Sequence, residues 1–387
     1  MTSLKIKYSG IGPLLFMAMC IILYAIPDNI QLPFRLLVFM GLIGTYLKAN
    51  KHSMPLIQFL IVIIAGFIVL SKIYIKTFDT SLLMVFLSII PIMNIDTYTS
   101  FSQKQIHVLR YIIYFLCFTI VGQLLIYRYE GRPNLSYEIN QSGSYLFLFF
   151  LLCDLLKIRL GKLLVICASF LLLSRLLILS IATFYFITIA NKCFPRILRW
   201  FTYTKLILLA NICIVLFSFV FLLIFARDEI SSTADDVSRL TNVVDTSNFI
   251  RFKINTDIIL GLFSGDPDLL YKGYGDITAN PKYLETRLLM PHNELIKGIA
   301  QFGLLVTIFF FLVSRKYISQ YVNSKTISYF VPIVLYTLIL WVRFTIIPSF
   351  EMIFILFILK LKSDENCLYY NRHYKLCWHG KSCNRSR

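Results

Sequence analysis

The chain has 387 residues, of which 58% are hydrophobic and 15% are charged, and its mean hydropathy is +0.73. Soluble domains carry about 25% charged residues, so this composition excludes an ordinary soluble domain. A formal net charge of +18 would suggest nucleic-acid binding in a soluble protein. Lysines and arginines at the cytoplasmic ends of membrane helices explain the charge here, and nucleic acid is not an expected partner.

Continuously apolar segments recur along the whole chain, many of them near the roughly 20 residues needed to cross the hydrocarbon core of a bilayer. A transmembrane β-barrel would instead show alternating segments of about ten residues. We therefore predict an all-α polytopic membrane protein with about twelve transmembrane helices. The expected helices occupy residues 10–26, 30–47, 54–71, 79–95, 106–126, 143–157, 162–173, 176–190, 205–226, 294–313, 326–343 and 348–361. The first lacks a small-residue cleavage site, so we expect it to be retained.

Basic residues concentrate on one set of alternate loops. The inner set includes Lys157, Arg159 and Lys162 together with the basic C-terminal tail, whereas the short outer loops carry few lysines and arginines. The positive-inside rule then places both termini in the cytoplasm. The chain divides into nine helices over 1–226, a large external loop over 227–293, three helices over 294–361 and a cytoplasmic tail over 362–387.

Cysteine and metal-ligand patterns contribute little. None of the nine cysteines lies between residues 227 and 293, so the external loop has no disulfide framework. Cys377, His379 and Cys383 superficially resemble a metal site, but they lie in a basic tail of low expected order. We predict neither a metal nor a cofactor.

Ser174-Arg175 is the first of three outer features that could contact a polar substrate. Here the helix over 162–173 gives way to the next with almost no loop. An arginine costs roughly 2.5–3.5 kcal/mol at the centre of a membrane helix and less near an interface. The alternative to a functional role is an interfacial arginine that extends its guanidinium to lipid headgroups.

The second feature lies inside the external loop. Residues 247–263 fit an amphipathic helix on the membrane surface, with Arg251 on its polar side and Phe249, Phe252, Ile259 and Phe263 on its apolar side. Gly273-Tyr274-Gly275 follows. A Gly-x-Gly pair is either a tight turn or a place where exposed amides approach a phosphate closely.

The third feature is Pro291-His292-Asn293-Glu294 at the predicted start of the tenth helix. His292 is the only histidine expected on the outer side. Asn293 can cap the helix, and Glu294 suits its first turn. A histidine beside a helix N-terminus favours the neutral imidazole, which is a base ready to accept a proton. The alternative is an interfacial histidine without a chemical role.

These three features, in this order, resemble the O-antigen ligase/polymerase superfamily of bacterial envelope glycan enzymes. The clearest match is HNELIKGIAQFGLL, residues 292–305, and the resemblance extends over residues 160–361. The first half of the chain matches only as membrane helices. The resemblance implies a GT-C-like membrane fold in the bacterial inner membrane, with one large periplasmic loop late in the chain.

The resemblance also implies roles for individual residues. Arg175 and Arg251 would grip the diphosphate of an undecaprenyl-diphosphate-linked oligosaccharide, and His292 would deprotonate the acceptor hydroxyl. Arg343 is a further candidate for phosphate or sugar contact. Gly273, Gly275 and Asn293 complete the expected substrate-binding set. The expected partners are this lipid-linked oligosaccharide and membrane lipid, and a chain-length regulator protein is compatible with them.

Three activities stay open at this stage. An O-antigen polymerase transfers the growing glycan to another lipid-linked repeat unit, and we favour it because the external loop is modest and carries no extra domain. An O-antigen ligase would transfer the glycan to lipid A–core instead. A flippase or transporter would need polar residues along the helices, yet few charges beyond Arg35, Asp154 and Lys297 lie inside them.

Overall fold

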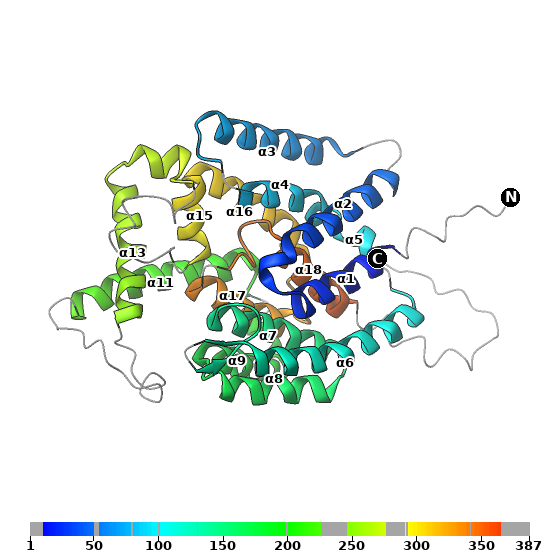
Figure 1. Ribbon diagram of the computed structural model, residues 1–387. Helices are drawn as coiled ribbons and strands as arrows, with labels where there is room; N and C mark the ends of the chain where they lie inside the picture. The colour runs from blue at the N-terminus through cyan, green and yellow to red at the C-terminus, as the bar shows by residue number, and fades with distance from the viewer. Residues whose placement is uncertain are drawn as a thin grey trace.

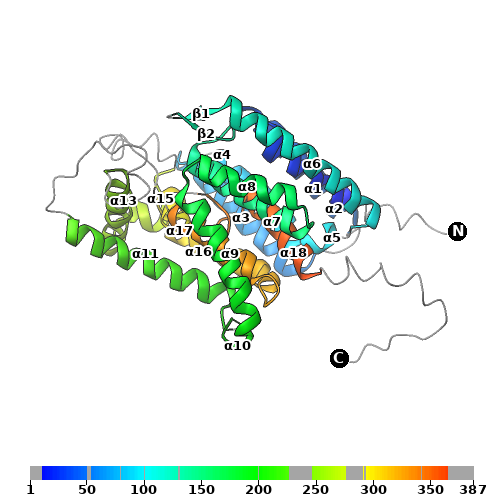
Figure 2. The same ribbon diagram turned by 90° about the horizontal axis from the view of Figure 1, so that it is seen from below.

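The computed structural model describes residues 11–49, 54–78, 80–99, 101–129, 131–198, 200–225, 246–275, 291, 293–340 and 342–364. Across these residues the chain is an α-helical bundle (Figure 1) with one two-stranded hairpin (Figure 2). Its elements are α1 Ile11–Ala25, η2 Asp28–Ile30, α2 Gln31–Ala49, α3 Leu56–Tyr74, α4 Thr80–Met93, α5 Ile95–Tyr98, α6 Gln103–Ile126, β1 Arg128–Tyr129, β2 Arg132–Pro133, α7 Ile139–Leu155, α8 Arg159–Leu171, α9 Arg175–Cys193, α10 Pro195–Leu198, α11 Tyr203–Phe225, α13 Thr246–Phe263, η3 Asp268–Lys272, α15 Glu294–Phe302, α16 Leu304–Ile318, η5 Ser319–Tyr321, α17 Ile327–Ile339 and α18 Phe350–Ser363.

All the segments predicted to be membrane helices contain a helix, which agrees with an all-α membrane protein. Within the described residues, five helices are both long and apolar enough to cross a bilayer: Asp28–Lys48, Leu56–Tyr74, Gln103–Ile126, Arg175–Cys193 and Tyr203–Val220. The other apolar helices are shorter. The number of spans, which side the termini occupy and the nature of the membrane stay predictions.

Two helices form the centre of the bundle. α7 is buried on nearly all sides, with Phe147, Phe149 and Phe150 fully inaccessible, and α18 is buried from Met352 to Leu359. A helix that is apolar all round belongs in a core of this kind. α3 lies at the edge of the bundle (Figure 1) and exposes large apolar side chains such as Phe67 and Leu70. This outward apolar surface favours contact with lipid.

The helix predicted over 294–313 is broken, which corrects the expectation of one continuous span. α15 ends at Phe302 and α16 begins at Leu304, with Gly303 between them at φ +86°. A Cβ on Gly303 would lie 2.7 Å from the carbonyl oxygen of Tyr271. Only glycine combines this positive φ with so close an approach. The sequence suggested a continuous helix because a single glycine in an apolar run is often tolerated.

The helix predicted over 247–263 is present as α13, and part of its predicted apolar side packs, since Ile259 is buried and Phe252 contacts the ring of Phe217 in α11. Ile254 and Ile258 are buried against α15 and η3, whereas Phe263 is 83% exposed. Asn255, a polar residue of the same helix, is only 2% exposed. α13 also packs along α11, and both lie at one end of the molecule (Figure 2). The neighbouring helices, rather than periodicity alone, select its buried side.

Candidate functional site

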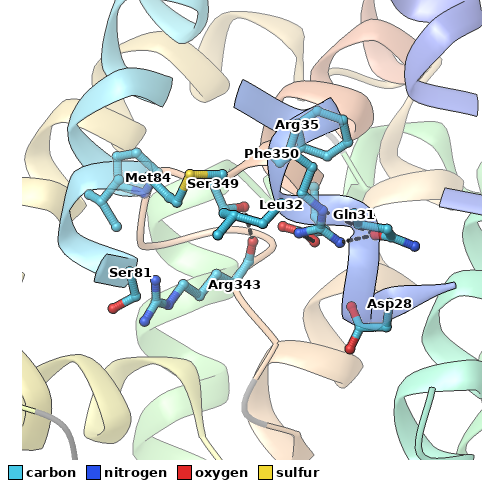
Figure 3. Close-up of a pocket in the computed structure, with 12 residues that line it drawn as sticks. Asp28, Gln31, Leu32, Arg35, Ser81, Met84, Arg343, Ser349 and Phe350 are labelled. Atoms are coloured by element: carbon cyan, nitrogen blue, oxygen red, sulfur yellow. Dashed lines mark hydrogen bonds and ion pairs between the residues drawn. The ribbon is translucent and has the colours of Figure 1, made fainter. Parts of the chain in front are cut away.

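A cavity of about 280 Å³ lies where four parts of the fold meet (Figure 3). α2 and its preceding turn η2 form one side, and α4 forms another. Arg343, Pro348 and Ser349 from the segment between α17 and α18, together with the first turn of α18, close it. Its charged lining residues are Asp28, Arg35, Arg343 and Glu351. All of them lie near the helix ends that the predicted topology places outside.

Arg35 is held at one wall of the cavity by side chains from α2 and α18. Its Nη1 lies 2.8 Å from Glu351 Oε1, and its Nε and Nη2 donate to Gln31 Oε1 over 3.1 and 2.7 Å. Its guanidinium also lies 5.2 Å from the ring centroid of Phe350. Gln31 and Arg35 share a face because they are four residues apart on one helix. The guanidinium therefore has a fixed orientation.

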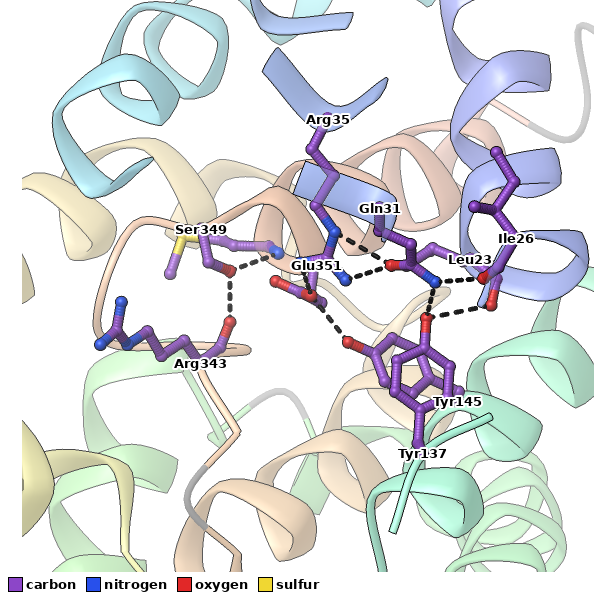
Figure 4. A network of polar contacts seen from close by, with 10 residues as sticks. Leu23, Ile26, Gln31, Arg35, Tyr137, Tyr145, Arg343, Ser349 and Glu351 are labelled. Carbon is purple, nitrogen blue, oxygen red and sulfur yellow. Dashed lines mark hydrogen bonds and ion pairs between the residues drawn. The ribbon is translucent and has the colours of Figure 1, made fainter. Parts of the chain in front are cut away.

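Two stacked tyrosines extend this network into the bundle (Figure 4). Tyr145 donates its hydroxyl to Glu351 Oε1 over 2.7 Å, and its ring lies 4.4 Å from that of Tyr137. The side-chain amide of Gln31 donates to the Tyr137 hydroxyl and, over 2.7 Å, to the carbonyl of Ile26. The network thus joins α1, α2, α7 and α18 in one polar cluster.

Arg343 lies at the opposite wall of the cavity. Its Nη2 donates to Gln301 Oε1 over 2.7 Å, and its guanidinium lies 5.4 Å from the ring centroid of Phe302. Gln301 in turn donates to Ser81 Oγ over 2.9 Å, and the Ser349 hydroxyl donates to the carbonyl of Arg343. α15 and α4 thereby position a residue that the sequence marked as a candidate.

Glu294 fixes the course of the segment that carries Arg343. Its Oε1 accepts the backbone N–H groups of Ile346 and Ile347 over 2.9 and 2.8 Å. Its Oε2 accepts the N–H and hydroxyl of Thr345 over 3.0 and 3.1 Å. Glu294 is fully buried, so these contacts replace water for its carboxylate. From the sequence we expected only a favourable first-turn residue here.

Asn293 acts as the predicted cap of α15. Its Oδ1 accepts the N–H of Ile296 over 3.0 Å, and its Nδ2 donates to Asn211 Oδ1 over 3.0 Å and to the carbonyl of Leu338 over 3.4 Å. The side chain is completely buried. Its role in this structure is to join α15 to α11 and to the end of α17. The expected contact with substrate stays a prediction.

Gly273 and Gly275 form a turn packed onto the end of α15. Their φ angles are +62° and +71°, and a Cβ on Gly273 would lie 2.4 Å from the carbonyl oxygen of Gln301. The N–H of Tyr274 donates to Ala300 O over 2.7 Å, and that of Gly275 to Gln301 O over 3.2 Å. The N–H of Gly273 donates to the carbonyl of Asp268. Because these amides already have acceptors, the geometry favours the tight turn over the phosphate cradle.

The other predicted residues lie elsewhere or outside the described residues. Arg175 starts α9 as an exposed residue after Ser174, whose hydroxyl accepts the N–H of Leu177 over 3.4 Å, and it does not line the cavity. Arg251 belongs to α13, but its side chain is outside the description, and so is the whole of His292. The cavity therefore contains one predicted site residue, Arg343.

Sequence reasoning missed the role of Arg35. It counted only as one of few charges inside the predicted helices, and its partner Glu351 is 316 positions away. The usable local signal was Gln31 four residues before Arg35 at the start of a helix, a spacing that places an amide beside a guanidinium. No family model matches the sequence, and no curated protein matches it.

Proposed function

We propose that the protein is an O-antigen polymerase of the bacterial inner membrane. It transfers a growing glycan from undecaprenyl diphosphate to a sugar hydroxyl of another lipid-linked repeat unit, on the periplasmic face. The proposal takes the outer ends of α2, α4, α15 and α18 as that face. It also assumes that the helical bundle crosses the membrane about twelve times.

One observation carries the proposal. Glu294, two residues after His292, binds three consecutive backbone amides of the segment that holds Arg343. Asn293 and Glu294 of the motif HNE therefore belong to the same structural unit as Arg343, an arginine facing a polar cavity. In the superfamily that this motif resembles, the histidine and outer arginines serve glycan transfer. What supports that assignment is that Glu294, the last residue of the motif, binds the segment that carries one of the outer arginines, Arg343. The position of His292 lies outside the described residues.

In the proposed reaction, the acceptor hydroxyl oxygen attacks the anomeric carbon of the donor. The bond between that carbon and the diphosphate oxygen breaks, and the diphosphate leaves with the electron pair. His292 accepts the hydroxyl proton, a role worth roughly 10²–10⁴-fold in rate. Arg175 and Arg251 stabilise the charge on the departing diphosphate, because guanidinium groups match phosphate oxygens in a bidentate manner.

The test replaces His292 by Ala in the native host and displays the lipopolysaccharide on a gel. We expect loss of the long ladder with a single capped repeat retained. His107→Ala is the matched control, because this exposed histidine on α6 lies at the predicted inner end. An unchanged ladder in the His292 variant would remove it from the mechanism.

The same gel separates the alternative activities. If the protein is a ligase, His292→Ala should remove every O-antigen band, including the single capped repeat. A flippase depends on its transport path rather than on a base, so His292→Ala would leave its ladder unchanged. The polymerase is favoured over the flippase because the polar groups of the described residues include a cluster at one end of the bundle, lining the cavity.

Lysine replacements test the proposed arginines. Arg175→Lys and Arg251→Lys keep the positive charge but lose the planar fork that binds two phosphate oxygens together. We expect each to shorten or abolish the ladder while the protein remains in the membrane at normal levels. Wild-type ladders from both variants would contradict the bidentate contact with diphosphate.

A further inference from the structure

The cavity between Arg35 and Arg343 is electrically balanced. Its lining contains two guanidinium groups and two carboxylates, those of Asp28 and Glu351. Its formal charge is therefore zero. A diphosphate entering it would face both carboxylates at close range, and like charges disfavour such an approach. A ligand with hydroxyl groups and little charge meets both donors and acceptors there.

The hydrogen-bonding capacity of Arg35 points the same way. Its Nε, Nη1 and Nη2 each already donate to Gln31 or Glu351. Bidentate recognition of phosphate uses a parallel pair of N–H groups from one guanidinium edge. Gln31 occupies the Nε–Nη2 edge of Arg35 and Glu351 takes one N–H of Nη1, which leaves one N–H on each terminal nitrogen for a ligand oxygen such as that of a hydroxyl.

Asp28 supplies one of the two negatively charged groups in the lining of the cavity. It lies in η2, is exposed and lines the cavity (Figure 3). Among the described residues its side chain has neither a hydrogen-bond nor an ion-pair partner. An ionised carboxylate only accepts hydrogen bonds, and its two oxygens can accept from two neighbouring hydroxyls of one sugar ring. Asp28 is thus an acceptor available to a ligand.

The size and the apolar wall of the cavity limit the ligand. At about 280 Å³ it lies just below the roughly 300–1,000 Å³ of ligand pockets, a size that suits one sugar ring. Leu32, Met84 and Val85 supply apolar surface between the charged groups. A sugar ring presents hydroxyls at its edge and C–H groups on its faces, which matches this mixed lining.

We infer that the cavity is a subsite for a single sugar residue of the glycan, with Asp28 as its hydroxyl acceptor and Arg35 and Arg343 as donors. This inference rests on the proposed function and deepens it, because it assigns these residues to sugar recognition and leaves the diphosphate to other groups. Glu351 and Gln31 act as positioning residues that hold the guanidinium of Arg35.

The test measures protection of a cysteine placed in the cavity. Leu32→Cys is introduced into the full-length protein in phospholipid nanodiscs, labelled with a methanethiosulfonate reagent and mapped by mass spectrometry. Leu32 is 50% exposed, so the substitution is tolerable and the thiol is accessible. Ile30→Cys is the matched control, since Ile30 is 49% exposed two residues away and does not line the cavity. Met84→Cys reports on the opposite wall.

Two probes are compared. The first is the repeat-unit oligosaccharide released by mild acid from the lipid-linked pool of the host, and the second is inorganic diphosphate. We expect the oligosaccharide to protect Cys at positions 32 and 84 but not at position 30. Adding Asp28→Asn should raise the concentration needed for protection about 10-fold or more, because a charged acceptor contributes about 1.5–3 kcal/mol.

Three results would overturn the sugar subsite. They are protection by diphosphate at equal or lower concentration, protection by neither probe, and protection that Asp28→Asn leaves unchanged. The outcome is independent of the His292→Ala gel. Protection by the oligosaccharide with an unchanged ladder would keep the subsite and remove His292 from the proposed mechanism. Loss of the ladder in His292→Ala, without protection of the cysteine at position 32, would keep the polymerase and discard the sugar subsite.

Discussion

Glu294 and Glu351 both lie in the first turn of a helix near the cavity, yet the groups that donate to them differ in kind. Glu294 accepts backbone N–H groups from Thr345, Ile346 and Ile347, whereas Glu351 accepts the side chains of Arg35 and Tyr145. A carboxylate bound by consecutive amides fixes the course of a backbone. One bound by side chains fixes their rotamers. The first region therefore builds the frame of the cavity, and the second orients one of its donors.

The comparison predicts that Glu294→Gln has the largest effect of any change beside the cavity. The new amide group turns an N–H₂ toward backbone donors and leaves at least one without an acceptor. Each unsatisfied buried donor costs about 1–3 kcal/mol, so we expect a loss of about 3 kcal/mol and a displaced Arg343 segment. Thermal unfolding of the purified protein and the lipopolysaccharide ladder measure these effects.

Glu138→Gln is the control for that change. Glu138 is exposed at the start of α7 and its side chain makes no cap hydrogen bond, so its replacement should leave both measurements unchanged. Equal stability of the two variants would show that Glu294 does not hold the frame.

The other region should tolerate a paired replacement. Glu351→Met alone leaves Arg35 without its counter-ion, and Arg35→Met alone leaves Glu351 without its own, so each single variant should lose about 2 kcal/mol. The double variant Arg35→Met/Glu351→Met removes both charges, and such paired apolar replacements are often neutral for stability. We expect its unfolding temperature to recover while glycan transfer does not. Additive losses in the double variant would contradict direct coupling of the pair.

The sequence predicted more of the region around Glu294 than of the region around Glu351. Asn293 and Glu294 were identified because helix N-termini have local signatures, and the apolar segments because membrane helices are continuous in the chain. The amides that Glu294 binds lie about fifty positions away, and Arg35 and Glu351 are 316 positions apart. Hydrophobic periodicity in the sequence does not reveal contacts between residues so far apart in the chain. The break at Gly303 and the exposure of Phe263 on α13 were missed for a related reason, since neighbouring helices decide them.

Gly273→Ala tests the frame of the cavity at the turn that packs onto the end of α15. The new methyl group would lie 2.4 Å from the carbonyl oxygen of Gln301, at a backbone φ of +62°. Because Gln301 binds Arg343, the displacement should reach the cavity as well as the turn. We expect a loss of about 1–2 kcal/mol from the left-handed backbone alone. Gly265→Ala shares a positive φ but has open space around it, so only the variant at position 273 should also shorten the ladder.

Ser349 joins the two regions, and its removal should have the smallest effect on stability. Its hydroxyl donates to the carbonyl of Arg343 and accepts the N–H of Met352, which caps α18 just before Glu351. Ser349→Ala should lower stability by about 1 kcal/mol, as for other lost caps. Ser102→Ala removes the cap of α6 away from the cavity and should have a similar effect on stability. If only Ser349→Ala shortens the ladder, then the link that Ser349 makes between the Arg343 segment and α18 contributes to glycan transfer as well as to stability. Identical ladders from both variants would mean that the two regions work independently.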